Sequence, residues 1–132
     1  MNVNKFVSSI YLGDRLLNGI SLDLVHNELR LKIDLISRIR SNDGNWNFYN
    51  DEDIKNGEIV LMNVSSLRFS PDSILPNDQI NYFSVTKNGE QDFFTMSVDS
   101  ISGNDKNEEV LIEIKADKVA LYNPYKDELI TN

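Results

Sequence analysis

The feature that most constrains the fold is an alternation of apolar and polar side chains over residues 29–35. Leu29, Leu31, Ile33 and Leu35 are apolar, and each position between them is charged. Successive side chains of a β-strand point to opposite faces, so a period of two is typical of a strand that buries one face. Residues 20–24 show the same alternation just before it. The two segments together predict an antiparallel hairpin.

The register of this hairpin follows from keeping both apolar sets on one face. A turn through His26 and Asn27 keeps both apolar sets on one face when the loop contains an even number of residues. An odd loop would place Asp23 against Leu31. The predicted opposite pairs are Leu24–Leu29, Leu22–Leu31, Ile20–Ile33 and Asp23–Arg30.

Further strands are indicated by segments rich in β-branched and aromatic residues between turn residues. These segments are 58–69, 80–87, 91–101 and 109–117, and a last strand runs through Val119 and Leu121. Asn88-Gly89 predicts a two-residue turn, because both residue types tolerate positive φ. That turn would place Lys87 opposite Glu90 and Phe83 opposite Phe94.

Little helix is expected. The alternation fails at Ile36, which indicates a bulge or bend. One helical turn is predicted over 51–57, with Asp51 as N-cap and Gly57 as the stop, and a short C-terminal helix from Asn123-Pro124 to Ile130. We therefore predict a mainly β, single-domain chain over residues 1–132, an antiparallel sandwich or partly open barrel of seven to nine strands with at most one or two short helices.

Charge and composition narrow the range of partners. The 132 residues carry a formal net charge of −8, and residues 67–132 contribute six basic and twelve acidic groups. Such a surface repels phosphate backbones and anionic lipids, so neither nucleic acid nor a membrane is expected as a partner. The chain has no Cys, which excludes disulfides and thiol chemistry. The N-terminus does not resemble a secretion signal, so we expect a cytoplasmic protein.

Catalytic signatures are weak. His26 is the single histidine, and the predicted turn supplies neither a nucleophile nor an orienting acid for it. No serine lies in a nucleophile-elbow motif, and the six glycines are spread singly rather than in a phosphate-binding loop. We predict no catalytic residue, no cofactor and no metal. An enzyme of another mechanism would need a concave cluster of carboxylates with perturbed pKa values.

The segment 42–53 combines side-chain oxygens with three aromatic residues. An EF-hand loop starting at Asp43 fails, because its sixth position is Phe48 instead of Gly and its twelfth is Ile54 instead of Glu. A looser oxygen site for an ion remains open, as does a polar turn. Exposed aromatics beside carboxylates are typical anchors of protein interfaces. The candidate partner-binding residues are Asp43, Trp46, Tyr49, Asp51, Glu52 and Asp53.

Four motifs are similar to those of a group of short bacterial proteins of unknown function. They are YLGDR (11–15), IDLISRIRS (33–41), WNFYNDEDIKNGEIVL (46–61) and LPNDQI (75–80). The resemblance implies a small single-domain bacterial protein. In size, acidity and lack of active-site motifs such proteins resemble immunity partners of polymorphic toxins.

Two functions of different classes follow. The first is a non-catalytic acidic protein-binding module, an immunity protein that occludes a basic toxin domain, since an anionic inhibitor associates rapidly with a basic target. The alternative is a small-ligand or ion-binding β-barrel with Tyr82, Phe94 and Met96 lining its pocket. The sequence allows a monomer or a homodimer.

Overall fold

The protein is mainly β, as the alternation predicts. The computed structural model describes residues 2–39, 53–101 and 108–132, which form twelve strands and one short helix. All strand pairs are antiparallel, and the strands lie in three sheets that do not close into a barrel. The predicted mainly β, antiparallel fold is therefore confirmed as a sandwich, although the described residues form twelve strands instead of the predicted seven to nine.

The largest sheet has five strands in the order β12-β11-β6-β3-β2. Its strands are β2 (Leu17–Asp23), β3 (Glu28–Ile33), β6 (Glu58–Met62), β11 (Lys118–Asn123) and β12 (Glu128–Ile130). Strands β2 and β12 form its two edges. The four-stranded sheet, in the order β7-β10-β9-β8, consists of β7 (Ser66–Ser70), β8 (Ile80–Asn88), β9 (Gln91–Ser100) and β10 (Glu108–Ala116).

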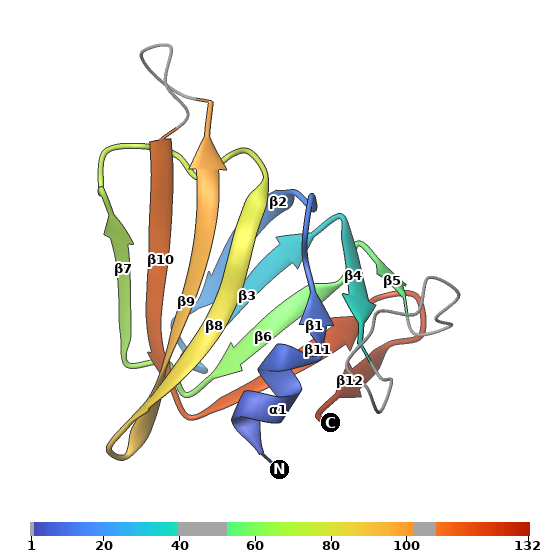
Figure 1. Cartoon of the computed structure of the whole chain (residues 1–132). Coiled ribbons are helices and arrows are strands. Elements are labelled where there is room, and N and C mark those ends of the chain that lie inside the picture. The colour runs from blue at the N-terminus through green and yellow to red at the C-terminus, as the bar shows by residue number, and fades with distance from the viewer. Residues whose placement is uncertain (1, 40–52, 102–107) are drawn as a thin grey trace.

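The two larger sheets pack face to face, with the four-stranded sheet in front of the five-stranded one in Figure 1. Alternate residues of each strand fill the space between them. The core includes Leu29, Leu31 and Ile33 of β3, Ile59 and Leu61 of β6, Phe94, Met96 and Val98 of β9, and Ile112 and Ile114 of β10, all of them fully buried. The alternation at 29–33 thus marks the centre of the core.

A three-stranded sheet adjoins the sandwich. It consists of β1 (Ile10–Tyr11), β4 (Leu35–Arg38) and β5 (Ile54–Lys55), in the order β1-β4-β5. The predicted break in the alternation is real and falls at Asp34, between β3 and β4. Its carboxylate oxygen Oδ1 accepts hydrogen bonds from the backbone N–H groups of Leu16 (3.0 Å) and Leu35 (2.8 Å), which holds the bend.

Two helix predictions are wrong, and one helix was missed. Residues 54–55 form strand β5 instead of a helical turn, whereas Asp51 lies outside the described residues. Residues 123–130 form the end of β11, a turn and β12. The helix that does exist, α1 (Val3–Ser8), packs beside β8 and β1 (Figure 1). Its signal was Asn2, which caps the helix by accepting from the N–H of Lys5.

Both predicted hairpins exist, each with a register two residues away from the prediction. In the first, Leu22 lies opposite Leu29 and Asp23 opposite Glu28, so the loop is residues 24–27. In the second, Asn88 lies opposite Gln91 and the turn residues are Gly89 and Glu90. Phe83 therefore faces Met96 instead of Phe94, although the Phe83 and Phe94 rings still stack with centroids 6.0 Å apart.

The predicted barrel pocket is absent from this arrangement. Phe94 and Met96 are fully buried in the sandwich core, whereas Tyr82 is 44% exposed. A bulge between Ile80 and Tyr82 shifts the register of β8. Tyr82 then pairs with Ser97 on the outer face of the four-stranded sheet, so the three side chains do not line a common space.

Candidate functional site

Most of the partner-binding residues predicted from the sequence lie where the structure gives no description. Asp53 is described: it is exposed and comes directly before β5. The others, Asp43, Trp46, Tyr49, Asp51 and Glu52, lie outside the described residues. The candidate site is therefore built from the described surface, where polar groups gather on the outer face of the five-stranded sheet and at one end of the four-stranded sheet.

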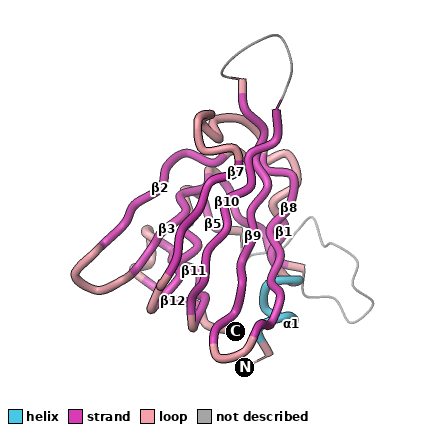
Figure 2. Tube along the Cα trace, turned by 90° about the vertical axis from the view of Figure 1, so that its left-hand side faces the viewer, coloured by secondary structure: helices cyan, strands magenta, loops and turns pink. Residues whose placement is uncertain are grey.

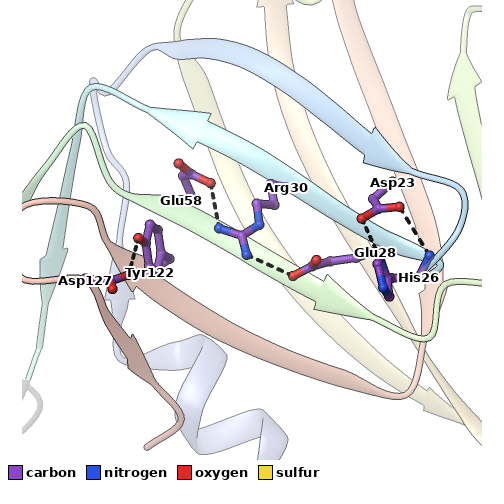
Figure 3. Close-up of polar contacts among 7 residues, drawn as sticks. All are labelled: Asp23, His26, Glu28, Arg30, Glu58, Tyr122 and Asp127. Carbon is purple, nitrogen blue, oxygen red and sulfur yellow. Dashed lines mark hydrogen bonds and ion pairs between the residues drawn. The ribbon is translucent and has the colours of Figure 1, made fainter.

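His26 forms an exposed pair with Asp23 at the tip of the β2–β3 hairpin (Figure 3). The ring nitrogen Nδ1 lies 2.8 Å from Asp23 Oδ2, while Oδ1 accepts from the backbone N–H groups of Val25 and His26. The hydrogen bond and charge of Asp23 raise the pKa of His26, and the same hydrogen bond lowers the pKa of Asp23. Sequence reasoning placed His26 in the turn correctly but missed this partner, because it paired Asp23 with Arg30.

Arg30 is the centre of an ionic network on β3 (Figure 3). Its guanidinium donates to Glu28 Oε1 at 3.1 Å and to Glu58 Oε1 at 3.2 Å, and it stacks 4.9 Å from the ring centroid of Tyr122. Burial opposes its charge, but the hydrogen bonds to the two glutamates outweigh that effect and raise the pKa of Arg30. The network balances the guanidinium with two carboxylates.

The network also has a structural role. Val60 pairs with Arg30 and Ala120 pairs with Val60, so both residues lie on the same outer face as Arg30. Both are nevertheless fully buried. Arg30 lies beside Val60 on this face, and the stem of such a long side chain covers apolar surface. Tyr122 contributes its ring, and its hydroxyl donates to Asp127 Oδ1 at 2.6 Å, which raises the pKa of Tyr122.

A shallow groove of about 420 Å³ adjoins the network. Asn56 Nδ2 donates to the hydroxyl of Tyr125 across it at 2.9 Å. The groove is lined by Asn18, Lys32, Ile33, Asn56, Glu58, Pro124 and Tyr125. Its amides, the ammonium of Lys32, the carboxylate of Glu58 and the hydroxyl of Tyr125 offer hydrogen bonds to a small polar molecule.

The described surface offers little for acid–base or metal chemistry. Asp23 orients the ring of His26, but in the described part of the chain no hydroxyl is hydrogen-bonded to that ring. Of residues 2–39, 53–101 and 108–132, no three His, Asp or Glu side chains come together as a metal site. The polar groups of Figure 3 bind one another.

Carboxylates dominate one end of the four-stranded sheet, the upper end in Figure 1. This end, which we call the anionic end, comprises the β7–β8 connection, the end of β9 and the start of β10. It carries Asp72, Asp78, Asp99, Glu108 and Glu109, with Leu75 and Ile101 about two-thirds exposed among them. The described residues within 69–86 and 97–112 include no Lys or Arg.

Backbone and amide contacts fix the anionic end. Asp78 N–H donates to the carbonyl of Asp99, and Asn81 Nδ2 donates to the carboxylate of Asp99 at 2.8 Å. Ile101 N–H donates to the side chain of Asn77. The exposed carboxylates and apolar side chains are therefore presented on a framework that is ordered before any partner arrives.

Comparison with known proteins gives one match. The model of a family described as "Family of unknown function (DUF6258)" matches residues 1–132. No curated protein and no solved structure matches the chain. Within the described part of the chain, no helix has the length and apolar character required to cross a membrane.

Proposed function

The chain belongs to the DUF6258 family, whose function is unknown, and on that premise we propose that it is a non-catalytic module that binds a basic protein. The observation that carries the proposal is the anionic end. Its described segments carry five carboxylates and no Lys or Arg, and the same segments include exposed Leu75 and Ile101. Exposed apolar side chains next to polar ones are a common feature of protein interfaces.

The charge of the whole chain favours the same partner. A net charge of −8 attracts a cationic domain from a distance and speeds its association, most of all at low ionic strength. A basic toxin domain that acts on nucleic acid has such a surface, and covering it would block access to phosphates. We propose that this chain acts as an immunity protein of that kind, by occlusion.

The test is to look for a small basic domain encoded beside this gene and to measure its binding to this chain by calorimetry at low and physiological salt. A gene neighbourhood without such a domain would overturn the immunity role. We expect tight binding that weakens as salt rises. The double variant Glu108→Gln/Glu109→Gln should bind about tenfold more weakly, because two carboxylates of the anionic end are neutralised.

A matched control is available in Glu90→Gln/Glu128→Gln, which removes two exposed carboxylates elsewhere and makes the same change in net charge. It should bind nearly as well as the native chain. Absence of binding by the native chain at low salt would overturn the immunity role. Equal losses in the two double variants would show that net charge alone, and not the anionic end, drives association.

A second candidate is binding of a small polar ligand, favoured by the groove beside Tyr125. The groove volume of about 420 Å³ is within the range of small-molecule sites. A thermal-shift screen of metabolites and metal ions tests it. A stabilising compound whose effect disappears in Tyr125→Ala would support this candidate, and no shift from any compound would eliminate it.

A further inference from the structure

Strand β2 and its flanks hold half of the exposed large apolar side chains of the described part of the chain. Ten such side chains are exposed, and five of them lie within residues 16–25. Leu22 is 45% exposed, Leu24 76% and Val25 86%. Contiguous apolar side chains on a surface mark interaction sites, whereas single ones are ordinary.

The exposure has a geometric cause. Strand β2 is an edge strand, paired with β3 on one side and with no strand on the other among the described elements. The β2–β3 hairpin reaches beyond the four-stranded sheet in Figure 2. On the core-facing side of the sheet, Ile20 pairs with Leu31 and Leu22 pairs with Leu29. Leu29 and Leu31 of β3 are fully buried, whereas Ile20 and Leu22 are exposed.

Strand β2 has few of the features that protect edge strands from pairing. Charged side chains, Pro, β-bulges and short length are the usual protection. A bulge lies between Leu17 and Gly19 and Asp23 ends the strand, but from Ile20 to Leu22 it has none of these features. The other edges of the two larger sheets have them: β7 contains Arg68 and is followed by Pro71, β8 contains Lys87, and β12 has only three residues. Strand β2 has seven residues, and no Lys, Arg or Pro occurs from Leu16 to Leu29.

The charges around β2 indicate the chemistry of its partner. Leu16, just before the strand, forms an isolated bridge with Gln79, which places the start of β2 beside Asp78 of the anionic end. Asp23 and Glu28 lie at the other end of the strand. A second copy of this chain would bring another net charge of −8. The cations opposite its β2 are Arg30 and Lys32, which lie on β3 and not along the open edge. A second copy therefore fits poorly. A segment with cationic side chains fits.

We propose that β2 accepts an extended segment of the partner, with alternating apolar and cationic side chains, as an added antiparallel or parallel strand. Its backbone pairs with the open edge of β2, its apolar side chains lie beside Ile20 and Leu22, and its cations face the carboxylates at both ends. This inference rests on the proposed function, because it names the way in which the same basic partner docks.

The probe is a synthetic peptide, acetyl-Val-Lys-Val-Lys-Val-Lys-Val-amide, titrated into the ¹⁵N-labelled chain at low salt. We expect changes in backbone amide chemical shifts and slowed amide exchange, both confined to β2 and to the part of the anionic end that lies beside Leu16. Leu22→Thr should weaken peptide binding about tenfold, the cost of losing one apolar contact. A peptide with Glu in place of Lys should bind at least tenfold more weakly.

The matched control is Leu129→Thr, a change to a side chain of similar exposure (48%) on β12, the opposite edge of the same sheet. It should leave peptide binding unchanged. Peptide shifts outside β2 and the neighbouring part of the anionic end, no shifts at all, or equal effects of the two variants would overturn the inference. Dimerisation of the native chain that Leu22→Thr abolishes would also overturn it, since the occupant would then be a second copy.

Binding of the neighbouring basic domain separates this inference from the proposed function. If that domain binds the native chain and Leu22→Thr equally well, β2 is not its docking strand, although the proposed function stands. If it does not bind the native chain, the proposed function fails even where the peptide occupies β2.

Discussion

At the scale of single residues, the pair of His26 and Asp23 gives a titration that can be followed directly. Asp23 raises the pKa of His26, so His26 should titrate above its ordinary value of about 6.5. Asp23→Asn should return that pKa toward 6.5, because the amide keeps the oxygen that caps the turn but has no charge. Imidazole chemical shifts across pH 4–9 measure it.

The sign of the pH dependence follows from the two shifts. The pKa of His26 is raised, so its contribution to stability is complete below about pH 6.5 and is lost as pH rises through its folded-state pKa. The pKa of Asp23 is lowered, so its contribution to stability is present above about pH 3.8 and is lost as pH falls through its folded-state pKa. Asp127→Asn is the control and should not move the His26 titration; identical His26 curves for Asp23→Asn and the native chain would contradict the pairing.

Gly57 is a second residue whose role can be measured. A Cβ at this buried position would lie 2.8 Å from Ile36 Cδ1 and from Ile54 Cγ2, two side chains that are themselves buried. Gly57→Ala should lower the free energy of unfolding by about 1–3 kcal/mol through overpacking. Denaturant unfolding measures the change.

The matched substitution is Gly19→Ala on β2, where the nearest side-chain atom, Lys32 Cδ, lies at an ordinary 3.6 Å. It should leave stability unchanged or slightly higher, since Ala restricts the unfolded chain more than Gly does. If both substitutions lower the free energy of unfolding by the same amount, close packing around Gly57 is not the reason why a larger side chain is disfavoured there.

At the scale of elements, two hairpin loops share one design. In each, an Asx residue closes the loop opposite a Glu five positions later: Asp23 opposite Glu28, and Asn123 opposite Glu128. The Asx oxygen accepts from the N–H groups two and three residues ahead. The residue before the Glu has positive φ, 54° in Asn27 and 47° in Asp127.

This design predicts a sharp response at Asn27. Asn27→Ala should lower the free energy of unfolding by about 1–2 kcal/mol, because Ala keeps the Cβ but loses the polar amide that lets Asn adopt the left-handed region. Asn27→Gly should cost little. Val25→Ala, two residues earlier in the same loop, is the control and should be neutral. Comparable unfolding midpoints for Asn27→Ala and Asn27→Gly would rule out backbone strain as the reason for Asn.

The same loops explain why some elements could not be predicted. Asn123-Pro124 is typical both of the start of a helix and of the start of a turn, because the Asx oxygen can cap either one. Only the pairing of β11 with β12 selects the turn. Alternation located β3, β10 and both hairpins, but it could not fix their registers, since shifts of two residues keep the same faces inward. It also could not show that Ile20 and Leu22 lie at an edge, because exposure depends on where the opposite sheet ends.

At the scale of the whole molecule, local pattern accounts for the fold class and long-range assembly accounts for the candidate site. The acidic excess of residues 67–132 is visible in the sequence. Its concentration at one end arises because the pairing of β7 with β10 and of β10 with β9 brings Asp72, Asp99 and Glu109 to the same end of their sheet. The network of Arg30 likewise joins β3 to Glu58 of β6 and Tyr122 of β11, which no local pattern specifies.

Hydrogen–deuterium exchange of the chain, alone and with a basic domain found to be encoded beside its gene, tests the central claim most directly. The account predicts that binding slows amide exchange in residues 70–80, 99–101 and 17–23, the anionic end and β2. Protection confined to β11 and β12, beside the groove and the Arg30 network, would contradict it.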